Sequence, residues 1–297
     1  MRKSVQNFPT EPNNLTDLVI PEALQKFDDG SFFLLHYSGP GPNRILVFTT
    51  QHNLKLLAKS KSVFSDGTFA TVPIRLFQQL YTIHAVVLDS VVPLIYALLP
   101  NKQGETYNTL FEVIKNLEPQ FEPELWMTDF EVAAINGINN NFNEVTVTGC
   151  FFHLQQCIWR KIQQLGLTSA YREPNGECAT NARSLAALAF VPERDVVQAF
   201  TELISDNEFD ARLQPLVDYF EDTWIGRPSL SSTRRPPTFQ IGLWNVHSRA
   251  VNGEHRTNNC IEGWHRRLQS SIDGVHPSVF RCIKALKTEH QRQKKTY

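Results

Sequence analysis

The sequence predicts an α/β protein in which helices cover the faces of a mixed β-sheet. Two apolar stretches of strand type, residues 79–88 and 91–100, flank the polar turn Asp89-Ser90 and predict a hairpin. Segments of helical and strand periodicity then alternate between residues 105 and 167. A hairpin followed by such alternation is typical of a mixed sheet, because a helix between two strands brings the second strand back parallel to the first.

Each element of this core has its own pattern. Residues 105–119 repeat apolar side chains at helical spacing, and residues 144–150 alternate as a strand does. Gly166 marks the end of an amphipathic helix. The expected order is strands 31–38 and 44–50 around the turn GPGPN, helix 51–60, strands 61–70, 79–88 and 91–100, helix 105–119, strand 124–129, helix 130–142, strand 144–150 and helix 151–167.

The two ends of the chain differ from this core. Residues 1–30 contain several prolines and asparagines and are expected to be weakly structured. Residues 176–226 have helical periodicity throughout, and the Pro-rich stretch 226–239 reads as a loop. Two further helices are expected, over 258–272 and 277–295.

Composition excludes several classes of protein. Of the 297 residues, 41% are hydrophobic and 20% charged, which excludes a disordered chain. The N-terminus lacks the apolar segment of a signal peptide, and His84, Asp89 and Pro93 interrupt the most apolar stretch. Five cysteines form no CxxC pair, which indicates reduced thiols. A soluble, intracellular protein is therefore expected.

Basic charge gathers toward the C-terminus. Residues 227–297 contain 13 Lys or Arg and 4 Asp or Glu, although the whole chain has a formal net charge of −1. This asymmetry predicts that the C-terminal part faces a polyanion. The alternative is a solvated basic helix.

Three carboxylates have notable settings. Asp66 lies within an apolar strand, Asp129 ends a later strand, and Glu262 lies near the start of a late helix. Carboxylates gathered at the end of a sheet suit Mg²⁺ or Mn²⁺. Each also has a simpler interpretation: a bulge or cap for Asp66, a helix cap for Asp129 and a solvated helix acid for Glu262. Glu131, two residues after Asp129, is expected to be an exposed first-turn acid.

The sequence also resembles a known family, the transposase domain of Mutator-like elements (MULE), from about residue 60 to 275. Six segments in the family's order carry the resemblance: SDGTF, FQQLYTIHAV, VPLIYALLPNKQGETYNTLFEVI, MTDFEVAAINGI, GCFFHLQQCIWRKIQQLGL and NNCIEGWHRRL. The resemblance implies a ribonuclease-H-like fold with an all-helical insertion before the last catalytic helix. It also implies a DDE triad that cuts and joins DNA with two divalent ions.

Residue by residue, the resemblance implies that Asp66, Asp129 and Glu262 are the catalytic, metal-binding triad, with Mg²⁺ or Mn²⁺ as cofactor. Cys150 and His153 match the family's C-x2-H motif. Two ligands are too few for a structural zinc site, so none is predicted. The motif could instead contact DNA phosphate or order the active site, or it could be a buried Cys beside a hydrogen-bonded His.

DNA is the expected partner, with self-association left open. The DNA-binding candidates are His265, Arg266, Arg267, Lys284 and Lys287. His265 shares a helix face with Glu262 and could equally support the metal site, whereas Trp264 is expected to pack into the insertion. A nuclear location follows from the DNA role.

The expected organisation has four parts: a flanking segment 1–60, a ribonuclease-H-like core 61–170, a helical insertion 171–257, and catalytic and basic helices 258–297. Residues 1–60 contain no cysteine, so the zinc-binding recognition domain of full-length relatives is not expected there. A truncated or host-reused copy is therefore predicted. Three activities stay open: a DNA strand-transferase or nuclease, an inactive transposase-derived DNA- or protein-binding protein, and an RNA-directed nuclease.

Overall fold

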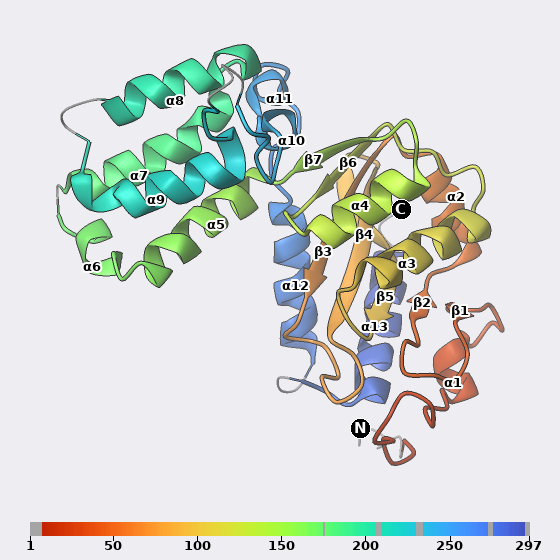
Figure 1. The fold of residues 1–297 in the computed structure, drawn as a ribbon. Coiled ribbons are helices and arrows are strands. Elements are labelled where there is room, and N and C mark those ends of the chain that lie inside the picture. The colour runs from red at the N-terminus through yellow and green to blue at the C-terminus, as the bar shows by residue number, and fades with distance from the viewer. Residues whose placement is uncertain (1–7, 175, 206–208, 230–233, 273–275, 295–297) are drawn as a thin grey trace. The chain divides into compact units, whose positions relative to one another are not determined.

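The computed structural model describes residues 8–174, 176–205, 209–229, 234–272 and 276–294. Its centre is a seven-stranded sheet in the order β1-β2-β5-β4-β3-β6-β7 (Figure 1). The strands are β1 (Leu34–Tyr37), β2 (Leu46–Phe48), β3 (Ser62–Thr68), β4 (Gln79–Val87), β5 (Ser90–Leu99), β6 (Leu125–Thr128) and β7 (Thr146–Gly149). β3 pairs antiparallel with β4 and parallel with β6, so the sheet is mixed. The predicted α/β class, a mixed sheet with helices on its faces, is confirmed.

The predicted hairpin is β4 and β5, whose pairing runs from Gln79 opposite Leu99 to Val87 opposite Ser90. Its two-residue turn places Leu88 at φ 46° and Asp89 at φ 62°. Tight hairpin turns take such positive φ values because the resulting twist matches that of the strands. Leucine has no intrinsic preference for this region, so the turn is held by the strand pairing on either side of it.

Helices cover both faces of the sheet (Figure 1). On one face α2 (Gln51–Ala58), α3 (Gly104–Leu117) and α4 (Val132–Asn141) enclose a core around Tyr107, Phe111 and Trp126. On the other face α12 (Asn259–Ser271) and α13 (Val279–Gln293) pack Trp264, Leu268 and related side chains against the sheet. The two layers therefore bury both sides of the central strands, which explains why these strands are almost continuously apolar.

The N-terminal segment is part of this fold, and its description as a flank is corrected here. β2 pairs antiparallel with β5, and its Val47 and Phe48 are fully buried. Upstream, α1 (Glu22–Gln25) and the buried Leu15 and Leu18 join the core beside α13. Apolar side chains at these positions outweigh the local prolines and asparagines that made the segment read as weakly structured. Residues 1–7 lie outside the described residues.

The chain divides into two compact units, residues 1–127, 131–147 and 259–297 in the first, and residues 128–130 and 148–258 in the second. The helical part therefore starts at 148, not at the expected 171. The reason is that α5 (Phe151–Gln164), expected in the core, packs through its amphipathic face against α7 (Glu177–Ala187) and α9 (Gln214–Phe220).

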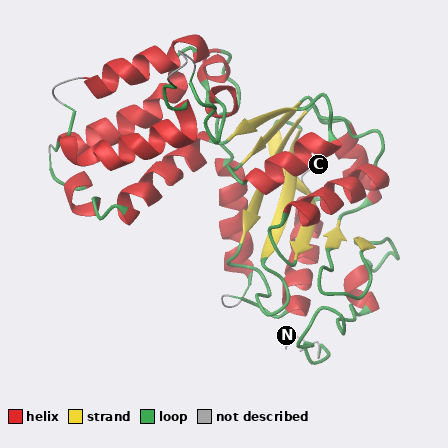
Figure 2. Cartoon of the chain, in the orientation of Figure 1, coloured by secondary structure: helices red, strands yellow, loops and turns green. Residues whose placement is uncertain are grey.

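The second unit is built of helices and loops (Figure 2). They are α5, α6 (Thr168–Tyr171), α7 (Glu177–Ala187), α8 (Val196–Ser205), α9 (Gln214–Phe220), α10 (Ile241–Trp244) and α11 (His247–Val251), with 3₁₀ turns Leu188–Phe190, Glu193–Asp195 and Ala211–Leu213 and a π-helical turn Glu221–Ile225. Its core stacks Trp224 on Phe239 at 4.9 Å between ring centroids, with Phe130 edge-on to Trp224 at 4.7 Å. Trp244 donates its indole N–H to the Trp224 carbonyl at 3.0 Å.

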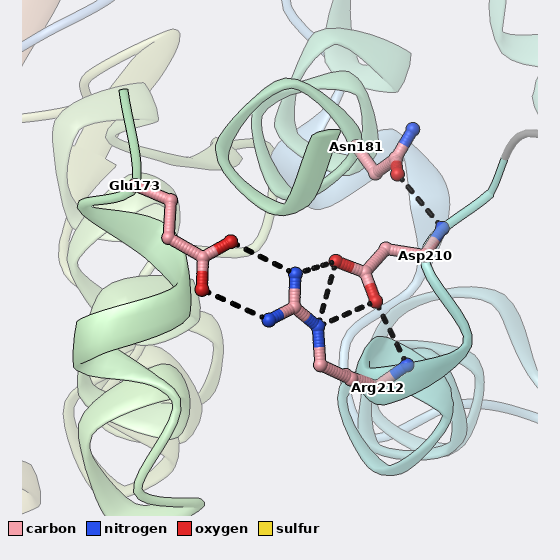
Figure 3. A network of polar contacts seen from close by, with 4 residues as sticks. All are labelled: Glu173, Asn181, Asp210 and Arg212. Carbon is pink, nitrogen blue, oxygen red and sulfur yellow. Dashed lines mark hydrogen bonds and ion pairs between the residues drawn. The ribbon is translucent and has the colours of Figure 1, made fainter. Parts of the chain in front are cut away.

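A polar network joins the loops of this unit (Figure 3). Arg212 makes paired hydrogen bonds to Glu173, at 3.1 and 3.2 Å, and also contacts Asp210 at 2.8 Å. The Asp210 backbone N–H donates to Asn181 of α7 at 2.9 Å. Hydrogen bonds from Arg212 hold the pKa of the Asp210 carboxyl below its usual value. These contacts satisfy the acids within the loops, so this network is structural.

Candidate active site

Asp66 lies inside β3, opposite Thr82 of β4, in a pairing with no register shift. The bulge interpretation is therefore wrong for this residue. Its Oδ1 accepts the backbone N–H of Gly67 at 2.9 Å, and the residue is 5% exposed. A Cβ added at Gly67 would lie 2.5 Å from the Gln79 side-chain oxygen, so a larger residue there would have to displace the end of that side chain. The strand thus buries a carboxylate, which is costly unless other groups complete its environment.

Glu262 comes from the first helical part of α12, far from Asp66 in the sequence. A carboxylate oxygen of Glu262 lies within 4.8 Å of one of Asp66. The Glu262 side chain is 18% exposed, and burial raises its pKa, an effect that the nearby Arg266 partly opposes. Glu262 is thus not a solvated helix acid. Two carboxylates this close in a partly buried, low-dielectric environment repel each other. A cation bound between them relieves that repulsion.

His265, three residues after Glu262 on α12, also approaches Asp66. Its Nδ1 is 3.7 Å from Asp66 Oδ2, and its Nε2 is 3.2 Å from the Thr82 hydroxyl. The Thr82 hydroxyl is in turn 2.9 Å from Nε2 of His84. Asp66, Thr82 and His84 are all buried, and His265 is 9% exposed.

This chain of contacts selects one arrangement of protons. Burial, and then the neighbouring His265, lower the pKa of His84 well below its usual value, so His84 is neutral. In one arrangement Nδ1 of His265 carries a proton, while Nε2 of His265 meets the Thr82 hydroxyl, which also lies 3.4 Å from the Asp66 carbonyl oxygen. The Nδ1 proton of His265 then faces Asp66. If Nδ1 carried no proton, its lone pair would point at the carboxylate. The carboxylate therefore favours the first arrangement, and His265 presents an N–H to Asp66.

Asp129 directly follows β6, at the carboxyl end of the strand. In the parallel pairing of β3 with β6, Phe64 is opposite Met127, so each strand carries a carboxylate two residues beyond this pair. Asp129 does not occupy the cap position of the next helix, because the N-cap of α4 is Glu131. Glu131 itself is not exposed as expected, because it pairs with Lys102 at 2.6 Å and its side chain is 17% exposed.

The Cys150 thiol donates to the side-chain oxygen of Asn258 at 2.9 Å, and the Asn258 backbone N–H approaches the sulfur at 3.3 Å. Cys150 and Asn258 are fully buried, and Asn258 directly precedes α12. The thiol is thus a structural contact that ties the start of α5 to the segment leading to Glu262. His153 lies in the first turn of α5, where burial and the nearby Arg160 lower its pKa to about 4.

The basic candidates fall into two groups. Arg266 and Arg267 are exposed on α12. Lys287 instead donates to the Ala23 carbonyl at 2.9 Å, and Lys284 lies 5.7 Å from the Phe8 ring centroid. These two lysines thus contact the N-terminal segment from α13.

His265 is buried and faces Asp66, which argues against the predicted contact of its side chain with DNA. Trp264 was wrongly expected in the insertion. It is 2% exposed and packs 5.6 Å from Tyr96 of the sheet. Trp264 and His265 are buried because they lie on the side of α12 that faces the sheet. The helical spacing of the buried residues in the sequence predicts this side: Ile261, Trp264, His265 and Leu268.

Two features were missed in the sequence. Thr82 and His84 lie within an apolar strand, and their partnership with His265 depends on the packing of α12 against the sheet. Arg292 was overlooked at the end of the chain, although its spacing from Glu289 on a basic helix was visible.

Comparison with known proteins finds a family model that matches part of this chain. Residues 62–157 match the model of the MULE transposase domain, which confirms the resemblance. No curated protein matches the chain. The solved Drosophila P element transposase strand transfer complex is similar over 82% of this chain and 74% of that chain, at 12% identity and a TM-score of 0.27. That TM-score is too low to carry an argument, so the assignment depends on the family match.

Proposed function

We propose that this chain, whose residues 62–157 match the model of the MULE transposase domain, cuts and joins DNA strands by metal-dependent phosphodiester chemistry. The observation that supports this best is the approach of Asp66 and Glu262 to within 4.8 Å. β3 contributes the buried Asp66, and the distant helix α12 contributes the half-buried Glu262. Neither acid is explained by a helix cap or a β-bulge.

Asp129 is proposed as the third carboxylate. It stands at the end of β6, and it lies as far beyond the Phe64–Met127 pair as Asp66 does on the neighbouring strand. Parallel strands that pair in register carry equivalent positions at the same level of the sheet. The register thus supports Asp129 as the partner of Asp66 in the triad.

The donor chemistry fits hard divalent cations. Carboxylate oxygens are the ligands that Mg²⁺ and Mn²⁺ prefer, and we propose that Asp66, Asp129 and Glu262 would hold two such ions. When bound, the ions supply Lewis-acid activation of a water or 3′-hydroxyl and stabilisation of the leaving oxygen.

The chain's own groups prepare this site. Gly67 donates its backbone N–H to Asp66 Oδ1, and His265 presents Nδ1–H toward Oδ2, so the carboxylate is oriented on both sides. With these two contacts made, each carboxylate oxygen of Asp66 keeps a lone pair for a cation. We further propose DNA as the substrate and the nucleus as the place of action.

The first experiment is calorimetric titration of Mn²⁺ and Mg²⁺ into the wild type, Asp66→Asn and Glu262→Gln. The matched control is Glu112→Gln, which removes one exposed carboxylate from α3 on the opposite face of the sheet. We expect binding to be lost in both site variants and kept in the control, with unchanged circular dichroism. Absence of binding in the wild type at millimolar metal, with DNA present, would overturn the proposal.

A second measurement separates an enzyme from an inactive binding protein. Labelled duplex DNA is incubated with the wild type and Mg²⁺ or Mn²⁺, and nicked and joined products are resolved on a denaturing gel. Products that need metal and Asp66 support the strand-transferase. Metal binding without products from DNA would favour the inactive relative, and products from RNA alone would favour the RNA-directed nuclease.

A further inference from the structure

A hollow of the first unit lies along α12, close to Glu262. It is a groove of about 1200 Å³ whose floor is the start of β5 and whose walls are α12 and the C-terminal part of α13. Three guanidinium groups line it, those of Arg266 and Arg267 from α12 and Arg292 from α13. We name this the arginine groove.

The charge of the arginine groove is available to a ligand. The side chains of Arg266 and Arg292 are 77% and 66% exposed, and Arg267 is also exposed. Glu289 is the acid among the lining residues, and it is mostly buried while it pairs with Arg292 at 3.8 Å. Arg266 also lies 3.6 Å from Glu262, so Arg266 and Arg292 each have an acidic neighbour, yet all three guanidinium groups remain exposed to a ligand.

The shape and chemistry indicate the class of ligand. Guanidinium groups bind phosphate oxygens in paired hydrogen bonds, and cations on two separate helices suit an extended polyanion better than a single small anion. The described lining contains no aromatic side chain on which an unpaired base could stack. Proteins that hold single strands use such stacking, whereas duplex backbones are held by phosphate contacts.

The wall of the arginine groove that α12 forms is also open next to Glu262. Gly263 lines the arginine groove, and a Cβ added there would meet no atom within 4 Å. An elongated chain can therefore approach the helix backbone at this point. Arg266 connects the two places, since it lines the groove and its Nη2 lies 3.6 Å from Glu262 Oε2.

We propose that the arginine groove holds the sugar-phosphate backbone of a DNA duplex, so that α12 presents a carboxylate to the reacting strand and arginines to the flanking duplex. This inference deepens the proposed function and rests on it for the identity of the polyanion. It assigns duplex binding to Arg267 and Arg292, and it removes Lys284 and Lys287 from that role.

The test is fluorescence anisotropy with a labelled duplex of about 30 base pairs in EDTA, so that binding is measured without any divalent ion. The variant is Arg267→Gln with Arg292→Gln, which leaves the Arg266 contact to Glu262 intact. The control is Lys55→Gln with Lys59→Gln, which removes two exposed charges from α2, on the opposite face of the sheet. Circular dichroism verifies that each variant folds.

Release of counterions sets the size of the effect. Each phosphate contact contributes about 0.9 to the magnitude of the slope of log affinity against log salt concentration. Two lost contacts therefore reduce that magnitude by about 1.8, and they lower the affinity about 60-fold at 0.1 M salt. The control is expected to change the affinity less than threefold. An equal loss in both pairs would show non-specific charge and overturn the proposal, as would tighter binding of the matched single strand.

A steric variant adds an independent test. Gly263→Gln fills open space in the groove and replaces a glycine inside a helix, so thermal stability should rise while duplex affinity falls at least fivefold. Unchanged affinity would contradict the location. Because these measurements contain no metal, loss of duplex binding and failure of the proposed catalysis are separate outcomes.

Discussion

Replacing Ser65 with alanine is expected to destabilise the first unit far more than one missing oxygen suggests. Ser65 is fully buried in β3, next to Asp66 but on the opposite face of the sheet. Its Oγ accepts two hydrogen bonds of 2.8 Å, from the Tyr81 hydroxyl and from the indole N–H of Trp126. One hydroxyl thus joins β4 and β6 to the central strand.

The magnitude follows from the two donors. Trp126 is fully buried and Tyr81 is 2% exposed, so neither donor recovers a hydrogen bond to bulk water when the acceptor is removed. Leaving a buried donor without its acceptor costs about 1–3 kcal/mol, which gives a loss of about 2–6 kcal/mol for Ser65→Ala. Domains of ordinary stability unfold with about 5–15 kcal/mol, so the loss is a large fraction of the total.

Urea unfolding followed by circular dichroism measures this loss, with Tyr81→Phe as the companion variant. Tyr81→Phe removes one donor and leaves Ser65 bonded to Trp126, so it should cost only about 0.5–1.5 kcal/mol. In the Ser65→Ala background the same change should cost nothing or restore stability, because it removes a donor left without this acceptor. A cost below about 1 kcal/mol for Ser65→Ala would refute the reasoning.

Three further outcomes are expected. Leu88→Asn should raise the unfolding free energy by about 0.5–1 kcal/mol in urea, because asparagine tolerates positive φ before Asp89; a decrease would contradict the turn geometry. Burial lowers the pKa of His290 to about 4, so the unfolded state binds the proton first and stability should fall by about 3 kcal/mol from pH 6.5 to 4. His290→Gln should flatten that pH dependence, and a parallel curve would argue against it. Thr82→Val should weaken Mn²⁺ binding about tenfold by releasing His265, whereas lower stability with unchanged affinity would show a purely structural role.

The local patterns of the sequence determined the elements and their order. Period-two and helical spacing predicted β4, β5, α3 and most other elements near their observed bounds, because burial on defined faces imposes those periods. An acid inside the apolar run of β3 was likewise visible without a structure. Local signals failed where long-range packing overrules them, as in residues 8–30, where α1 and the buried Leu15 and Leu18 join the core beside α13.

Tertiary structure alone decided which side chains meet. Asp66 and Glu262 come together because α12 returns to the sheet after a long helical excursion, and sequence spacing carries no information about that return. The same packing turned His265 inward to Thr82 and left Arg267 outward on the groove, although the two are neighbours on one helix. The sequence by itself determined which chemical groups this protein has; the contact of α12 and α13 with the sheet decided which of them act together, since a helix assigns roles by the direction each residue faces.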